Sequence, residues 1–200
     1  MSTSLGITPT PDDGVRLSGT RVWDESARPT APRPDPGRRY TPRERANGRH
    51  LVDVHDHLRA ELTRLRDLAG QVAAGTLDAG AARSHINTMT MRRHDWTLGA
   101  YCESYCRMVT MHHSMEDAMV FPHLRRVEPA LAPVLDRLKE EHQAIHHVLE
   151  RVDRALVAFV ADPAGLDELR AVVDLLTDTL LSHLSYEERE LVEPLARHGL

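Results

Sequence analysis

The chain has 200 residues, of which 41% are hydrophobic and only 4% aromatic, so its apolar content is mainly Leu, Val, Ala and Met, as suits helices. This length suffices for one domain of about 150 residues with an appendage, and a net charge of −5 disfavours nucleic acid or an anionic membrane as a partner. No stretch approaches the roughly 18 apolar residues of a membrane span, and residues 1–14 lack the pattern of a signal peptide, so we expect a soluble cytoplasmic protein.

Residues 1–43 differ in composition from the rest of the chain. They contain seven of the twelve prolines and seven arginines, with almost no helical periodicity. We expect this segment to be an extended or partly disordered arm, with Val22 and Trp23 able to pin part of it against the remaining domain, residues 44–200.

Hydrophobic periodicity predicts four long helices after the arm, and hence an all-α, antiparallel four-helix bundle. The expected helices run from Arg43 to Ala74, from after Asn87 to Pro122, from after Pro129 or Pro133 to before Asp162, and from there to about Pro194. A link through Gly75 and Gly80, with one short helical turn at Asp78 to His85, joins the first two.

The first helix carries two histidines, and helical geometry distinguishes them. His55 lies on the stripe that contains Leu51 and Leu58, whereas His57 lies about 120° from the centre of that stripe. We expect His55 to face the core and His57 to face solvent.

The second helix contains the motif His-x-x-x-Glu at His112 and Glu116. Residues four apart on a helix share a face, so both side chains can bind one ion. The pair falls on a stripe with Leu98, whereas His113 lies about 100° away and is expected at the margin or in solvent. Four methionines follow the same helix and are expected to fill the core: Met108, Met111, Met115 and Met119.

The third helix places His142 and His146 four residues apart in a stripe of leucines, with His147 about 140° away. A buried imidazole needs a partner for each ring nitrogen. A metal supplies one partner to each ring, so we expect His142 and His146 to be ligands.

The last helix repeats the motif His-x-x-x-Glu at His183 and Glu187. Glu188 falls about 140° from the inward stripe, so Glu187 is the favoured ligand. Glu190 also faces inward, either as a partner of a ligating imidazole or as a helix-end residue that reaches water.

Seven inward donors result, and they are too many for one ion. A tetrahedral zinc site takes four ligands, whereas seven nitrogen and oxygen donors suit two first-row ions that share bridging carboxylates. A di-iron centre is the natural interpretation, with these ligands: His55, His112, Glu116, His142, His146, His183 and Glu187.

This motif order resembles the hemerythrin-like, or HHE cation-binding, family over roughly Leu51 to Leu195, with Pro122 and Pro194 also resembling the family pattern. The resemblance implies a four-helix bundle that holds an oxo- or hydroxo-bridged pair of irons at the seven positions. Glu187, four residues after the last ligating histidine, departs from the invertebrate hemerythrins and is similar to bacterial members of the family.

Binding of O₂, or of peroxide or nitric oxide, is the expected function, because a pair of ferrous ions with two carboxylates keeps a positive charge. A catalase-like or peroxidase-like enzyme is the alternative, and Tyr101, Tyr105 and Tyr186 are candidates to assist a bound oxygen species. Alternatively, these tyrosines have a structural role, in which the ring packs in the core and the hydroxyl binds a neighbouring group. A sensor of iron, oxygen or redox state is a further alternative, although no output domain is recognisable.

Overall fold

The computed structural model describes residues 5–74 and 84–199, the side chains of residues 84–97 and 163 excepted, and within this part the regular structure is helical. The long helices are α1 (Pro42–Ala74), α2 (Ser84–Met115), α4 (Ala132–Ala161) and α5 (Leu166–His198). Short elements are the 3₁₀ turns η1 (Glu25–Ala27), η3 (Pro129–Leu131) and η4 (Pro163–Gly165), the π-helical segment η2 (Glu116–Val120) and the helix α3 (Phe121–Val127). The predicted link through Gly75 and Gly80 lies outside the described residues.

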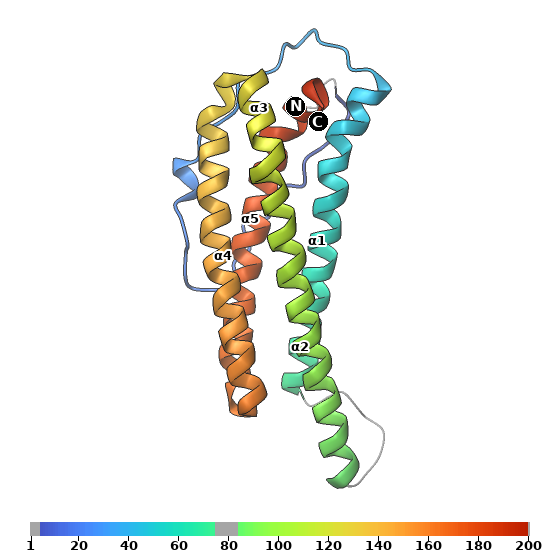
Figure 1. The fold of residues 1–200 in the computed structure, drawn as a ribbon, viewed down its shortest axis with the longest axis vertical. Helices are drawn as coiled ribbons and strands as arrows, with labels where there is room; N and C mark the ends of the chain where they lie inside the picture. Colours follow the sequence, from blue (N-terminus) through green and yellow to red (C-terminus); the bar gives the residue numbers. More distant parts are fainter. Residues whose placement is uncertain (1–4, 75–83, 200) are drawn as a thin grey trace.

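The four long helices form an antiparallel bundle, as the sequence predicts (Figure 1). Helix α1 packs against α5 and α2, and α4 packs against the same two helices, which closes a ring. The first and last described residues lie at the same end of the bundle (Figure 1). Helix α1 begins at Pro42, one residue before its predicted start, and α4 ends where Asp162 precedes a proline.

The apolar core is divided into two clusters along the bundle axis. One contains Leu58, Val109, Ile145 and Leu180. The other contains Leu51, Phe121, Leu138 and Leu191. A polar layer lies between the two clusters. Its members His55, His112 and His142 each fall in the chain between a residue of one cluster and a residue of the other, so apolar side chains flank the layer at both ends.

Two prolines do not end their helices, contrary to prediction. The helical path continues past Pro122 to Val127, and α5 continues past Pro194 to His198. A proline removes one backbone donor and its ring crowds the carbonyl four residues earlier. At Pro122 the preceding π turn, with its wider hydrogen-bond spacing, accommodates this loss.

The N-terminal arm lies along the outer side of α5. Backbone N–H groups of Leu17 and Ser18 donate to the carboxylate of Asp178 at 2.7–2.9 Å. Leu5 and Ile7 are buried in the second core cluster. Because the arm covers the face that α5 would otherwise expose, nearly every residue of α5 from 175 to 196 is buried.

Three of the four methionines that were predicted to fill the core do not do so. Met111, Met115 and Met119 are exposed, and only Met108 packs against the first cluster. The inward face of α2 is formed instead by Leu98, Cys102, Tyr105 and Val109, which are all buried.

Candidate metal centre

Seven nitrogen- and oxygen-bearing side chains from all four sides of the bundle converge in the polar layer. Their ligand atoms form two groups, within each of which all atoms lie within 4.8 Å of one another. The first group is His113, His142 and His183, and the second is His55, His112, Glu116 and Glu187. Helix α1 supplies one donor, α2 with η2 three, α4 one and α5 two.

The two carboxylates connect the two groups. Glu116 Oε1 lies 3.3 Å from Nε2 of His112, and its Oε2 lies 3.6 Å from Nε2 of His142. Glu187 Oε2 lies 3.6 Å from Nε2 of His55 and 3.5 Å from Nε2 of His183. Each carboxylate therefore lies close to a histidine of either group.

Many of these donor atoms are buried without a hydrogen-bond partner: Nε2 of His113, His142 and His183, Oε2 of Glu116, and both carboxylate oxygens of Glu187. Leaving a buried polar atom unpaired costs about 1–3 kcal/mol, so a cluster of six implies a missing binding partner. Donors held about 2.1 Å from a common ion lie roughly 3–4 Å apart, which matches the distances above. The residues present thus fit a metal.

Three outer carboxylates orient the imidazoles. Nδ1 of His55 lies 3.0 Å from Glu188, Nδ1 of His142 lies 3.0 Å from Asp117, and Nδ1 of His183 lies 3.1 Å from Glu141. An Nδ1–H that donates to a carboxylate leaves the Nε2 lone pair free to bind a metal. The N–H is assigned here by its acidic partner.

The arm and two arginines hold these outer carboxylates in turn. Arg28 of the arm binds both oxygens of Glu141 at 2.8 and 2.9 Å. Arg59 donates to Glu188 at 2.6 Å, and the backbone N–H of Thr10 donates to the same carboxylate at 2.7 Å. A chain of contacts therefore runs from the arm through a carboxylate to a ring of the site.

Burial and neighbouring charge set the protonation of the site. Burial lowers the pKa of His112 to about 3 and that of His113 well below its usual value, so both rings are neutral at pH 7. Burial and the neighbouring Glu187 raise the pKa of Glu116 well above its ordinary value. Burial would raise the pKa of Glu187, but the nearby imidazoles of His183 and His55 outweigh it, so this pKa is lowered. Neutral imidazoles are the form that binds a metal.

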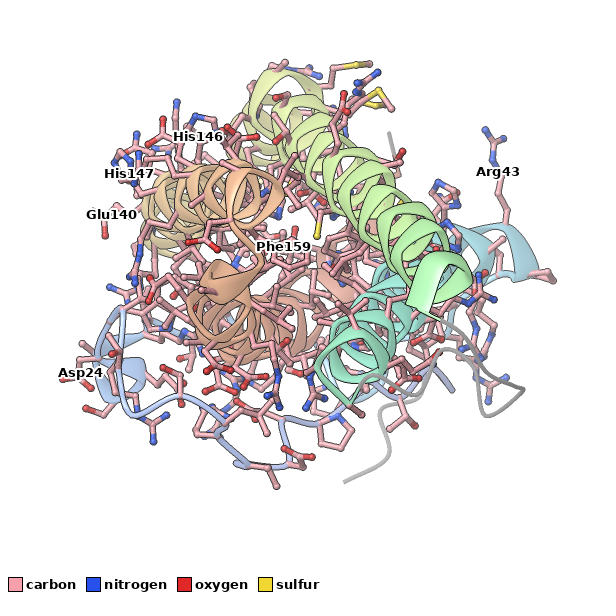
Figure 2. The ribbon with its side chains drawn as sticks, turned by 90° about the horizontal axis from the view of Figure 1, so that it is seen from below. Asp24, Arg43, Glu140, His146, His147 and Phe159 are labelled. Atoms are coloured by element: carbon pink, nitrogen blue, oxygen red, sulfur yellow. The ribbon has the colours of Figure 1, made fainter. Side chains whose placement is uncertain are left out.

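Two predicted positions on these helices are wrong. His146 does not face the core: its side chain is 58% exposed and lies beside Glu150, and Figure 2 shows it pointing away from the bundle while Phe159 points toward the centre. His113, which was expected at the margin or in solvent, is buried and stacks on His142 with ring centroids 4.1 Å apart.

Both errors arise because the predicted inward stripes of α2 and α4 were not centred on the true inward faces of these helices. In α4 the inward line passes through Glu141, Ile145 and Val148, and His146 lies about 130° from it, counting about 100° per residue. In α2 the four buried residues of the inward face are centred midway between His112 and His113, about 50° from each. Both adjacent histidines therefore reach the site.

The other histidines and glutamates considered in the sequence differ in burial and in their partners. His55 is buried and His57 exposed. Glu188, predicted to point away from the core, is fully buried because the arm and α1 cover it. Glu190 is buried too, but it accepts the N–H of Ala31 at 2.7 Å and holds the arm, not an imidazole.

None of the three candidate tyrosines forms a hydrogen bond from its hydroxyl to one of the seven clustered side chains. Tyr101 donates to Glu61, Tyr105 to the carbonyl of Leu58, and Tyr186 to the carbonyl of Pro29. Packing accounts for them. The ring of Tyr186 contributes indirectly, because the guanidinium of Arg28 lies 4.7 Å from its centroid.

Comparison with protein families agrees with this geometry. The model of the hemerythrin HHE cation binding domain matches residues 47–195, which is most of the chain and includes every donor of the cluster. The chain belongs to this family. No curated protein and no solved structure matched it.

Membership in the HHE family makes the polar layer a cation-binding site, and the seven clustered donors are its candidate ligands. Within the described part of the chain, no helix combines the length and apolar character needed to cross a membrane.

Proposed function

We propose that this HHE domain holds two iron ions and binds a small oxygen ligand, O₂ or a related species such as peroxide or nitric oxide. The observation that carries the proposal is the set of six buried donor atoms without a hydrogen-bond partner, which belong to His113, His142, His183, Glu116 and Glu187. With His55 and His112, these residues form one group of three histidines and one group of two histidines and two carboxylates. Histidine and carboxylate donors in this ratio suit iron better than thiophilic ions.

The protein contributes a buried and pre-oriented set of donors. His55, His142 and His183 are each fixed by an outer carboxylate, and the rings of His112 and His113 are uncharged at neutral pH. When bound, two ferrous ions would supply two electrons and a free coordination position for a small oxidant.

The group with fewer imidazoles is the better candidate for that position. It contains His55 and His112, whereas three imidazoles belong to the other group. His112 is also the most exposed of the five rings, with 13% of its side chain accessible, while His55 and His183 are fully buried. A small ligand therefore reaches the centre most directly beside His112.

Peroxide turnover is the alternative that the family resemblance suggests, and phenols near the ligands would support it. The hydroxyls of Tyr101, Tyr105 and Tyr186 have partners outside the cluster, so that support is absent. Binding is favoured over turnover for this reason.

Anaerobic reconstitution tests the proposal. Protein loaded with ferrous iron should show new charge-transfer absorption on addition of O₂, and the absorption should disappear when O₂ is removed. Iron-loaded His147→Ala is the matched control, because that ring is exposed, and it should behave like wild type. Rapid gas evolution from added peroxide, without a reversible spectrum, would favour the enzyme instead.

A further inference from the structure

A pocket of about 570 Å³ lies between α1 and α2 and opens onto the metal centre. His112 and Glu116 form its inner wall. The rest of its lining is mainly apolar and includes Leu51, Val54 and Met111. The centre therefore faces an apolar space on the side where its most exposed ring lies.

The pocket is much larger than a diatomic ligand requires. One water molecule takes about 30 Å³ of liquid, whereas sites for organic ligands usually measure about 300–1,000 Å³. A second pocket beside the centre, of about 430 Å³ between α2 and α4, is lined by polar groups such as Asp117, Gln143 and His147. The pocket on the α1 side of α2 is therefore mainly apolar, and the pocket on its α4 side is polar.

The lining of the apolar pocket selects against charged ligands. Among its described lining residues there is no lysine or arginine, and Glu116 is the only acid. Burying an unpaired charge costs far more than burying a hydroxyl or carbonyl that finds a hydrogen bond. Met108, Met111 and Met115 add flexible, polarisable walls that adapt to ligand shape.

We infer that this pocket binds an uncharged organic molecule whose polar end meets His112 and whose apolar part lies against the methionines and the side chains of α1. The inference goes beyond the binding of a small oxidant and needs no metal, since the apolar walls are formed by the protein alone. An organic molecule would then bind next to the metal centre, in addition to any diatomic gas.

Displacement of the neutral fluorophore N-phenyl-1-naphthylamine by straight-chain 1-alkanols tests the inference. From 1-hexanol to 1-octanol, affinity should rise about fourfold per methylene, the factor that corresponds to about 0.8 kcal/mol per buried CH₂. Octanoate and octylammonium should bind more weakly than 1-octanol. Tighter binding of either ion would overturn the assignment of an uncharged ligand.

Exposed methionines provide matched variants. Met111→Asp and Met115→Asp place a charge in the pocket wall, whereas Met119→Asp makes the same change at an exposed methionine outside the lining. The first two should weaken 1-octanol binding at least fivefold, and the third should change it less than twofold. Equal effects at all three positions, or no displacement by any alkanol, would overturn the inference.

Two further measurements separate this inference from its rivals. Sedimentation of the same samples shows whether a second copy covers the methionines: a dimer that excludes the fluorophore and dissociates in Met111→Asp would overturn the inference. Iron content is measured in parallel. Two irons without alkanol binding refute the pocket alone, and alkanol binding without iron refutes the proposed function alone.

Discussion

Replacement of Arg28 by alanine tests whether the arm supports the metal centre. The Arg28 guanidinium binds both oxygens of Glu141, also donates to Ser182 at 3.0 Å, and is nearly buried. Glu141 in turn accepts from Nδ1 of His183. Arg28→Ala therefore removes an outer support of one ligand without touching any donor of the centre.

The size of the effect follows from burial. Removing one partner of a buried ion pair costs about 3–5 kcal/mol, because the other charge is left unpaired. Arg137 keeps its hydrogen bond of 2.8 Å to Glu141, so we expect the lower end, about 3 kcal/mol. For a chain of this size that corresponds to a fall in Tm of about 6–12 °C. Loss of an outer partner lowers metal affinity about 10–100-fold, and since Arg28 acts through Glu141 we expect about tenfold.

Two assays separate these effects. Guanidinium unfolding of metal-free protein measures stability, and competition with a chelator measures affinity for ferrous iron. Arg16→Ala is the arm control, because Arg16 pairs with Asp12 and Glu25 inside the arm. It should leave iron affinity within about threefold of wild type. An Arg28→Ala protein with wild-type stability and wild-type affinity would refute the chain of support.

Three further predictions follow from burial and packing. Hydrogen bonds with a histidine and an arginine outweigh burial and lower the pKa of Glu141 to about 2, so its stabilising contribution is present above pH 4.5 and is lost as pH falls toward 2. Metal-free wild type should lose roughly 3 kcal/mol more over that range than Glu141→Gln, measured by unfolding at each pH; equal losses would contradict this. Burial raises the pKa of Cys106 to about 11 and that of Cys102 to about 12. Iodoacetamide at pH 8 should therefore label the folded chain at less than about one hundredth of the rate of the unfolded chain, and comparable rates would be the adverse result. A Cβ at Gly48 would lie 2.7 Å from a backbone carbonyl of α5, so Gly48→Ala should destabilise by about 1–3 kcal/mol. Gly99→Ala, which meets only an ordinary contact at 3.7 Å, should stabilise by up to about 1 kcal/mol; thermal unfolding compares the two, and equal shifts would contradict the close approach of α1 and α5.

Helical periodicity was sufficient to predict the bundle, because long amphipathic stripes specify both the helices and the sides they bury. It was less reliable for single histidines. The choice between His112 and His113 depends on the centre of a stripe to within about 50°, and a wheel that includes the exposed Met119 shifts that centre.

The supporting residues were harder to predict, because they depend on the arm. Glu188 lies off the inward stripe of α5 and is buried only because residues of the arm and of α1 cover that face. Glu141 lies directly before His142, but its role depends on Arg28, more than a hundred residues earlier in the chain. No local pattern in the sequence contains such long-range pairs.

Iron content per chain, measured for wild type, His113→Ala and His146→Ala after anaerobic loading, tests the central claim most directly. We expect two irons in wild type and in His146→Ala, because the His146 side chain is exposed. We expect fewer than two in His113→Ala, because the His113 ring belongs to the three-histidine group. A single iron in wild type, or loss of iron in His146→Ala with retention in His113→Ala, would contradict it.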